Sequence, residues 1–254
     1  MRLALLGDPV AQSRSPAIHQ AALRSLGIEG SYEARRVDAE GLKQALAEVA
    51  AGALDGVNVT MPLKAAALAA VDDASTLAIR AGAVNTVSRR DGVVFGDNTD
   101  VDGISDAWGS SEMPDDAPIL VLGSGGAAAA ALLALEGSEL LIASRRRGGG
   151  GLLAARLGIV ATEISWGSVV EGAVVVNATP LGMNGESLPG GVVQGCVGLF
   201  DMAYGVSATP SVAQAGARPV VDGIDMLVAQ AARSFEIWTG VPAPVDVMAV
   251  AARL

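Results

Sequence analysis

The chain has 254 residues, of which 51% are hydrophobic and only 3% aromatic, and its formal net charge is −10. This length allows a large aliphatic core divided into two lobes, because single cores stop growing near this size. The acidic balance argues against a general nucleic-acid surface, since a polyphosphate would be repelled. The one cysteine, Cys196, cannot form an internal disulfide, which either fits a reducing cytoplasm or carries no information on the compartment.

Short apolar runs alternate with helical patterns along the chain. The apolar runs predict strands at 2–7, 32–37, 56–60, 118–123, 139–144, 173–179 and 197–202. Helical patterns lie between them, for example at 16–27, 39–51, 126–136 and 226–239. This alternation predicts an α/β fold with parallel sheets covered by helices on both faces. The uncharged run 117–135 has the length of a membrane span, but its central glycines predict a strand, a turn and a buried helix instead.

Polar clusters follow strands or loops in the front half of the chain. They are QSRSP (12–16), NVTMPLK (58–64), AVNT (83–86) and DNTD (97–100). Parallel strands bring their carboxyl ends to one sheet edge, where ligands bind. Hydroxyl and amide groups with one lysine and one aspartate suit a polyhydroxylated carboxylic acid. Each cluster also has a structural alternative: a helix start at Ser15-Pro16, a simple turn at 97–100, and a surface lysine at Lys64.

A glycine turn follows the predicted strand 118–123. Its glycines fall as Gly123-x-Gly125-x-x-Ala128, a variant of the dinucleotide-binding fingerprint. Gly123 would make the tight turn, and Gly125 would let backbone amides approach a pyrophosphate at the helix start.

Three arginines stand where an NAD-binding fold would carry an acid, about 20 residues past Gly125. The segment reads Ser144, Arg145, Arg146, Arg147, followed by four glycines that would fray the start of any helix there. Guanidinium groups pair with a 2′-phosphate, which an acid would repel. The segment therefore predicts NADP binding, and a solvated basic turn is the alternative.

In order and spacing, these clusters resemble the shikimate dehydrogenase family over nearly the whole chain. The motifs are GDPVAQSRSPAIHQ (7–20), GVNVTMPLK (56–64), AGAVNT (81–86), GDNTD (96–100), GSGGA (123–127), NATPLGM (177–183), DMAYG (201–205) and DGIDMLVAQ (222–230). The resemblance implies a substrate-binding domain with a parallel sheet, formed by residues 1–103 and 224–254, and a Rossmann-like NADP-binding domain, residues 104–223. It implies a cytoplasmic enzyme, monomeric or homodimeric, that reversibly reduces 3-dehydroshikimate to shikimate with NADPH. Neither a nucleic acid nor a membrane is expected as a partner.

The same resemblance implies a role for each matching residue. Lys64 and Asp100 would form the catalytic pair. Substrate contacts would come from Ser13, Ser15, Asn58, Thr60, Asn85, Thr99, Tyr204 and Gln230. Cofactor contacts would come from Gly123, Gly125, Gly126, Ala127, Ser144, Arg145, Arg146, Met202 and Gly223. No metal-ligand spacing occurs, so no metal is expected.

The scarcity of lysine supports the role implied for Lys64. The chain has two lysines, Lys43 and Lys64, against fifteen arginines. A ketone that accepts a hydride also needs a proton, which an ammonium can donate, whereas a guanidinium with a pKa above about 12 hardly can. Two alternatives remain open: a quinate/shikimate dehydrogenase paralogue using NAD(P), and a non-catalytic NADP-binding sensor. One departure from the family pattern is Gln12, where a histidine is usual.

Overall fold

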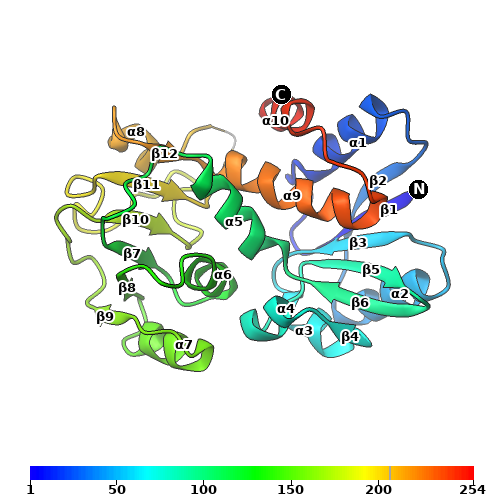
Figure 1. The fold of residues 1–254 in the computed structure, drawn as a ribbon, viewed down its shortest axis with the longest axis horizontal. Coiled ribbons are helices and arrows are strands. Elements are labelled where there is room, and N and C mark those ends of the chain that lie inside the picture. The colour runs from blue at the N-terminus through cyan, green and yellow to red at the C-terminus, as the bar shows by residue number, and fades with distance from the viewer. Residues whose placement is uncertain (206) are drawn as a thin grey trace. The chain divides into compact units, whose positions relative to one another are not determined.

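The computed structural model describes residues 1–205 and 207–254. These residues form two compact units, one of residues 1–103 with 228–254 and one of residues 104–227 (Figure 1). Each unit contains its own six-stranded sheet, so the predicted α/β class is confirmed. No helix in the described part of the chain is both long and apolar enough to cross a membrane.

The first unit alternates strands and helices from its start. Its elements are β1 (Arg2–Gly7), α1 (Ser15–Ser25), β2 (Ser31–Arg36), α2 (Ala39–Ala50), β3 (Gly56–Val59), α3 (Lys64–Ala70), β4 (Asp73–Ala74), α4 (Thr76–Ala81), β5 (Thr86–Arg90), β6 (Val93–Asp97) and α10 (Val245–Arg253). The chain passes from one unit to the other within α5 (Thr99–Gly109) and within α9 (Gly223–Thr239).

The first sheet is mixed, which corrects the parallel sheet predicted for this unit. Its strand order is β2-β1-β3-β5-β6-β4, and β5 runs antiparallel to both β3 and β6. The cause is the two-residue turn Asp91-Gly92, where both residues have positive φ angles, 51° and 85°. Such a turn suits the twist of a hairpin, whereas a parallel connection needs a dozen residues or more.

Strand β1 lies between the two hydrophobic cores of this unit, and its side chains point alternately into one core and the other. Ala4 and Leu6 face a core shared with α2, α3 and α4. Leu3 and Leu5 face the opposite side, where they pack with Tyr32 and Trp238. Because successive side chains of a strand point to opposite faces, both faces of the sheet are covered.

The second unit is all parallel. Its elements are β7 (Ile119–Leu122), α6 (Gly126–Ala134), β8 (Leu140–Ala143), α7 (Gly149–Leu157), β9 (Thr162–Ile164), β10 (Val174–Asn177), β11 (Gly198–Asp201), α8 (Pro210–Ala215) and β12 (Val220–Val221). The strand order β12-β11-β10-β7-β8-β9 is that of a Rossmann sheet. The order reverses between β7 and β10, and ligands of such sheets bind at the carboxyl ends of the strands beside that reversal.

The glycine run after the arginines begins helix α7, where the sequence predicted fraying. The carboxylate of Glu163 accepts hydrogen bonds from Gly150 N at 3.2 Å and from Gly151 N at 3.1 Å. A Cβ at Gly151 would lie only 2.8 Å from Glu163 Oε2. Because glycine has no side chain, the carboxylate of Glu163 on β9 can approach these N–H groups and cap the helix, in place of a side chain at the N-cap position.

Candidate active site

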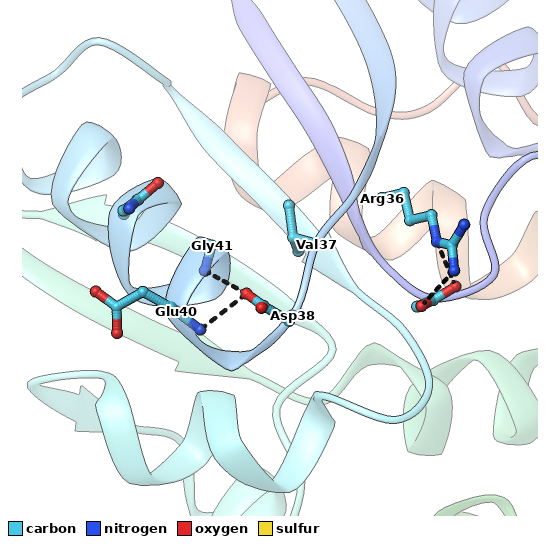
Figure 2. Close-up of a pocket in the computed structure, with 7 residues that line it drawn as sticks. Arg36, Val37, Asp38, Glu40 and Gly41 are labelled. Atoms are coloured by element: carbon cyan, nitrogen blue, oxygen red, sulfur yellow. Dashed lines mark hydrogen bonds and ion pairs between the residues drawn. The ribbon is translucent and has the colours of Figure 1, made fainter.

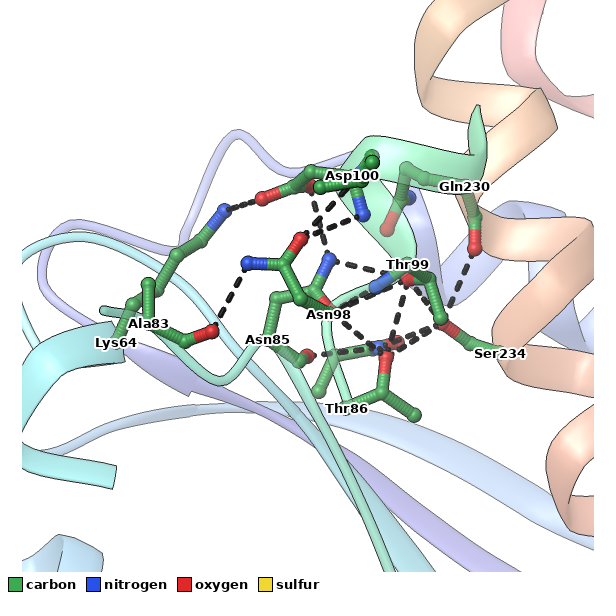
Figure 3. A network of polar contacts seen from close by, with 11 residues as sticks. Lys64, Ala83, Asn85, Thr86, Asn98, Thr99, Asp100, Gln230 and Ser234 are labelled. Atoms are coloured by element: carbon green, nitrogen blue, oxygen red, sulfur yellow. Dashed lines mark hydrogen bonds and ion pairs between the residues drawn. The ribbon is translucent and has the colours of Figure 1, made fainter. Parts of the chain in front are cut away.

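Lys64 and Asp100 form an ion pair, 2.6 Å from Nζ to Oδ2 (Figure 3). Lys64 is the first residue of α3, and Asp100 lies in the first turn of α5. Their side chains are 29% and 11% exposed, so the pair is sheltered but reachable from solvent. A helix dipole disfavours a cation at the helix start. The neighbouring carboxylate offsets this cost for Lys64.

Asn98 fixes the start of α5 and so the position of Asp100. Its Oδ1 accepts from Asp100 N at 3.1 Å and from Val101 N at 3.4 Å. Its Nδ2 donates to Ala83 O at 2.9 Å. The segment 97–100 thus contains a helix cap, because Asn98 caps the helix that carries Asp100.

The amide of Asn85 has one possible orientation. Its Nδ2 donates to Asp100 Oδ1 at 2.8 Å, and its Oδ1 accepts from the backbone N–H of Thr99 at 2.8 Å. A flipped amide would place oxygen against a carboxylate oxygen and N–H against N–H. Asn85 is only 2% exposed, so water does not compete for its hydrogen bonds. Its amide binds Oδ1 of Asp100, and Oδ2 of the same carboxylate binds Lys64.

Buried hydroxyl and amide groups surround Asn85. Asn58 Nδ2 lies within hydrogen-bonding distance of Asn85 O, Thr86 Oγ1 and Ser234 Oγ. Asn58 Oδ1 accepts from Tyr32 OH at 2.8 Å. Figure 3 shows Asn85, Thr86 and Thr99 gathered beside Ser234 of helix α9. The predicted residues Asn58, Asn85, Thr99 and Asp100 thus lie together.

Three members of the network were missed by sequence reasoning: Tyr32, Thr86 and Ser234. Thr86 is the last residue of the motif 83–86, and this motif was its only signal. Ser234 lies four residues after the predicted Gln230 on α9, one helical turn away. Tyr32 lies on β2, where its ring packs in the core and only its hydroxyl reaches Asn58.

The other predicted substrate residues have varied surroundings. The Oγ of Ser13 accepts from Ser15 N at 3.3 Å, so Ser13 rather than Ser15 supports the start of α1. Thr60 directly follows β3, and a Cβ on Gly7 would lie 2.4 Å from Thr60 Cγ2. Gln230 is on α9 in the first unit and is 9% exposed, whereas Tyr204 belongs to the second unit.

The Lys64–Asp100 arrangement can hold one proton on Lys64 and donate it to a ligand. An ammonium has three N–H donors, and Asp100 Oδ2 accepts from one of them. Within the described residues Asp100 is the one acceptor of Lys64 Nζ, which leaves its other donors to an oxygen atom of a ligand. Asp100 is itself held by Asn85, so the ammonium is aimed by a fixed carboxylate.

The glycine turn of the second unit exposes backbone at the end of β7. Gly123 has φ 129°, and a Cβ there would lie 2.8 Å from Ala178 O, so this position needs glycine. Gly125 is the N-cap of α6 and provides no side-chain cap. The first-turn amides at Gly126 and Ala127 have no acceptor within the helix, which suits a pyrophosphate.

The arginine segment forms a tight turn after β8. Arg146 O accepts from Ser144 Oγ at 2.7 Å and from Gly149 N at 2.9 Å. Ser144 thereby uses its only proton to hold the turn. Arg145, Arg146 and Arg147 are exposed and form no ion pair with any residue that the structure describes.

Met202 and Gly223 are neighbours at the same sheet edge. A Cβ on Gly223 would lie 2.4 Å from Ala203 O and 3.0 Å from Met202 O. The segment that carries Met202 is anchored by the buried carboxylate of Asp201, which accepts from Asn177 Nδ2 at 2.7 Å and Thr209 Oγ1 at 2.6 Å.

A surface hollow lies elsewhere in the first unit (Figure 2). It is lined by Asp8, Arg36, Val37, Asp38, Glu40, Gly41 and Gln44, none of which was predicted as a site residue. Asp38 caps α2 through Glu40 N and Gly41 N, and Arg36 pairs with Asp8 at 2.9 Å. The charged groups of the hollow are therefore engaged locally, Arg36 with Asp8, Asp38 with the start of α2, and Glu40 with Lys43 outside the hollow.

His19 gives a testable pH dependence of stability. It is fully buried, stacks on Tyr32 with 4.4 Å between ring centroids, and neither nitrogen has a hydrogen-bond partner among the described residues. Burial lowers the pKa of His19 from 6.5 to about 3. Between these values the unfolded chain binds a proton that the folded chain does not. We expect the free energy of unfolding to fall by up to about 1.4 kcal/mol per pH unit below 6.5.

Urea unfolding at about pH 7 and about pH 5.5 measures this loss. The control variant is His19→Phe, which keeps an aromatic ring and removes the only histidine. We expect its loss of stability to be smaller by about 1 kcal/mol over this interval. Equal losses in the two proteins would show that His19 is not the cause.

Comparison with known proteins links both units to one family. Family models match residues 5–87, as the shikimate dehydrogenase substrate binding domain, and residues 223–253, as the shikimate 5′-dehydrogenase C-terminal domain. The shikimate dehydrogenase (NADP(+)) of Thermus thermophilus is 40% identical over 245 residues, which cover 94% of this chain and 93% of the relative. The chain belongs to the shikimate dehydrogenase family. The resemblance drawn from the motifs is thus confirmed.

Other members of the shikimate dehydrogenase family agree. The shikimate dehydrogenase (NADP(+)) of an Exiguobacterium species is 37% identical over 249 residues, covering 95% of this chain and 94% of the relative. The crystal structure of the Thermus thermophilus shikimate 5-dehydrogenase in complex with NADP(H) and shikimate has a TM-score of 0.88 at 38% identity, covering 100% of this chain and 98% of that one.

Proposed function

We propose that this chain catalyses the reversible reduction of 3-dehydroshikimate to shikimate with NADPH, in the biosynthesis of chorismate and the aromatic amino acids. The observation that carries the proposal is the Lys64–Asp100 pair, held by the oriented amide of Asn85. Family membership supplies the substrate, and this geometry supplies the proton chemistry that a ketone reduction needs.

The residues of the first unit have distinct roles in this proposal. Lys64 donates a hydrogen bond to the substrate oxygen and then transfers a proton to it during reduction, and the proton returns in the reverse direction. Asp100 orients the ammonium and accepts from a neighbouring hydroxyl of the substrate. Ser13, Ser15, Thr60, Thr99, Tyr204 and Gln230 are proposed as further substrate contacts, as are Asn58 and Asn85.

The second unit is proposed to bind NADP(H), and the chemistry of its residues suits this cofactor. First-turn amides at Gly126 and Ala127 suit the pyrophosphate, and the guanidinium groups of Arg145 and Arg146, which pair with no carboxylate among the described residues, suit a 2′-phosphate. Gly123 and Gly125 shape the turn, Ser144 holds the arginine turn, and Met202 and Gly223 are proposed to lie beside the nicotinamide. When bound, the cofactor supplies the hydride.

Absorbance at the NADPH band tests the function directly. Shikimate is added to the purified protein with NADP⁺ and, separately, with NAD⁺, and quinate replaces shikimate in a parallel pair. We expect reduction with shikimate and NADP⁺. Turnover of quinate at an equal or higher rate would favour the quinate/shikimate paralogue. Binding of NADPH without any turnover would favour a non-catalytic sensor.

The arginine turn predicts a specific loss of NADP⁺ recognition. We expect the double variant Arg145→Ala/Arg146→Ala to lower kcat/KM for NADP⁺ by about 10²-fold, because each charge-assisted hydrogen bond contributes about 1.5–3 kcal/mol. The value for NAD⁺ is expected to stay within about 2-fold, since NAD⁺ has no 2′-phosphate. Arg147→Ala, which removes one positive charge from the same turn, is the control for a general effect of lost charge. A parallel loss with both cofactors would overturn this assignment.

We also propose that the enzyme acts in the cytoplasm as a monomer or homodimer. Cys196 is free and buried, and burial raises the pKa of its thiol, so it is poorly reactive. A chain without disulfides does not depend on an oxidising compartment for its stability. Light scattering of the purified protein at several concentrations decides between the two assemblies.

A further inference from the structure

One hydroxyl joins the C-terminal helix to the whole polar network of the site. Ser234 Oγ lies 3.0 Å from Asn58 Nδ2, 2.8 Å from Thr86 Oγ1 and 3.1 Å from Thr99 Oγ1. It also lies 3.1 Å from Gln230 O on its own helix. Ser234 has no exposed surface, so water does not substitute for any of these contacts.

We propose that Ser234 is a positioning residue that fixes the Asn85 amide, and through it the Asp100 carboxylate, for the reaction. The inference rests on the proposed function, because the geometry it protects is that of the Lys64–Asp100 pair. Ser234 does not touch Lys64 or Asp100. It acts through the two threonine hydroxyls that lie between it and Asn85.

The hydrogen atoms of the network can be assigned from obligatory donors and acceptors. The two protons of Asn85 Nδ2 go to Asp100 Oδ1 and to Thr99 Oγ1. Thr99 Oγ1 is thereby an acceptor, and its own proton is left for Ser234 Oγ or Asn85 Oδ1. Thr86 Oγ1 donates to Asn85 Oδ1 at 3.1 Å. Thr86 thus gives its proton to Asn85, and Ser234 Oγ is an acceptor open to the proton of Thr99, while the one proton of Ser234 is left for Thr86 Oγ1 or Gln230 O.

The contacts of Ser234 exceed what a structural serine in a helix needs. A hydroxyl that bonds back to the carbonyl four residues earlier is common and local, and Gln230 O serves that purpose here. The other three contacts reach β3, β5 and the start of α5. In a buried network each lost partner leaves a polar group unsatisfied, which loosens the groups that remain.

Ser234→Ala tests the inference, with Ser88→Ala as the matched control. Ser88 lies two residues after Thr86 on the same strand, is also buried, and its hydroxyl has no hydrogen-bond partner in the described structure. We expect Ser234→Ala to lower kcat about 10-fold with KM for NADP⁺ within about 2-fold. Ser88→Ala is expected to keep kcat within about 2-fold. An unchanged kcat in Ser234→Ala overturns the proposal.

A double-variant cycle separates positioning from general destabilisation. If Ser234 acts through Asp100, Ser234→Ala has almost no further effect on kcat in an Asp100→Asn background. The same 10-fold loss in both backgrounds, with a lowered thermal midpoint, shows a structural role and overturns the proposal. Thr86→Val removes the next hydroxyl without changing side-chain volume and is expected to behave as Ser234→Ala does. It serves in the same cycle should Ser234→Ala fold poorly.

A readout that is independent of turnover keeps this inference apart from the proposed function. The side-chain NH₂ group of Asn85, assigned by its loss in Asn85→Ala, is followed by NMR hydrogen exchange. We expect slow exchange in the wild type and in Ser88→Ala, and at least about 10-fold faster exchange in Ser234→Ala. Unchanged exchange overturns the positioning role. Absence of shikimate turnover in the wild type, with this exchange pattern intact, overturns only the proposed function.

Discussion

Lys64→Arg is expected to lower turnover by about 10²-fold or more while leaving the affinity for NADPH unchanged. The guanidinium keeps the positive charge and can still pair with Asp100, now through two N–H groups. However, arginine has a pKa above about 12 and does not release a proton to the developing oxyanion. Its longer, planar head also displaces the donor from the position set by the 2.6 Å contact with Asp100.

The measurements are kcat for shikimate oxidation and the NADPH dissociation constant from fluorescence titration. Lys43→Arg is the control, because Lys43 is the only other lysine and is exposed on α2, where it pairs with Glu40. We expect this control to match the wild type in both measurements. Near-normal turnover of Lys64→Arg would falsify the role of Lys64 as the proton donor.

Asn85→Asp is expected to reduce turnover at neutral pH by about 10²-fold or more and to lower the thermal midpoint. The variant places a second carboxylate about 3 Å from Asp100 Oδ1 in a position that is 2% exposed. Two like charges at this distance repel by roughly 5 kcal/mol at an effective dielectric constant of about 20. Either a proton binds between them or the side chains separate, and in both cases Asp100 no longer aims the ammonium of Lys64.

The swapped variant Asn85→Asp/Asp100→Asn isolates the cause. It restores one carboxylate beside one amide, so its thermal midpoint is expected to return toward that of the wild type. Turnover is not expected to return, because the charge now lies away from Lys64. Differential scanning calorimetry and the shikimate assay distinguish these effects. An Asn85→Asp protein with the wild-type midpoint and wild-type turnover would contradict the role of the Asn85 amide in holding Asp100.

Much of the fold was predictable because its buried strands are continuous apolar runs. The runs at 2–7 and 118–123 correspond to β1 and β7 within one residue at each end. The hairpin of β5 and β6 was missed although Asp91-Gly92 is a strong turn signal, because no strand was expected on either side of it. That omission led directly to the expectation of a parallel first sheet.

The members of the site that belong to recognisable motifs, Lys64, Asp100 and the neutral Asn58, Asn85 and Thr99, were named from the sequence, whereas Tyr32, Thr86 and Ser234 were not. Lys64 is distinguished by the scarcity of lysine and Asp100 by its motif. Ser234 is an ordinary helix serine in the sequence, and its partner Asn58 lies 176 positions away. A hydroxyl in such a network leaves no pattern along the chain, because its role depends on contacts made only after the elements pack.

The discontinuity of the first unit has a consequence for how the protein emerges from the ribosome. Residues 104–227 form a continuous unit, whereas the other unit needs residues 228–254 to be complete. Synthesis proceeds at about 5–20 residues per second, and domains fold as units while it continues. The inserted unit is therefore free to fold before the segment carrying Ser234 has left the exit tunnel. Until then the partners of Ser234 on β3, β5 and α5 lack its hydroxyl, so the polar network of the site is completed only after α9 has been synthesised.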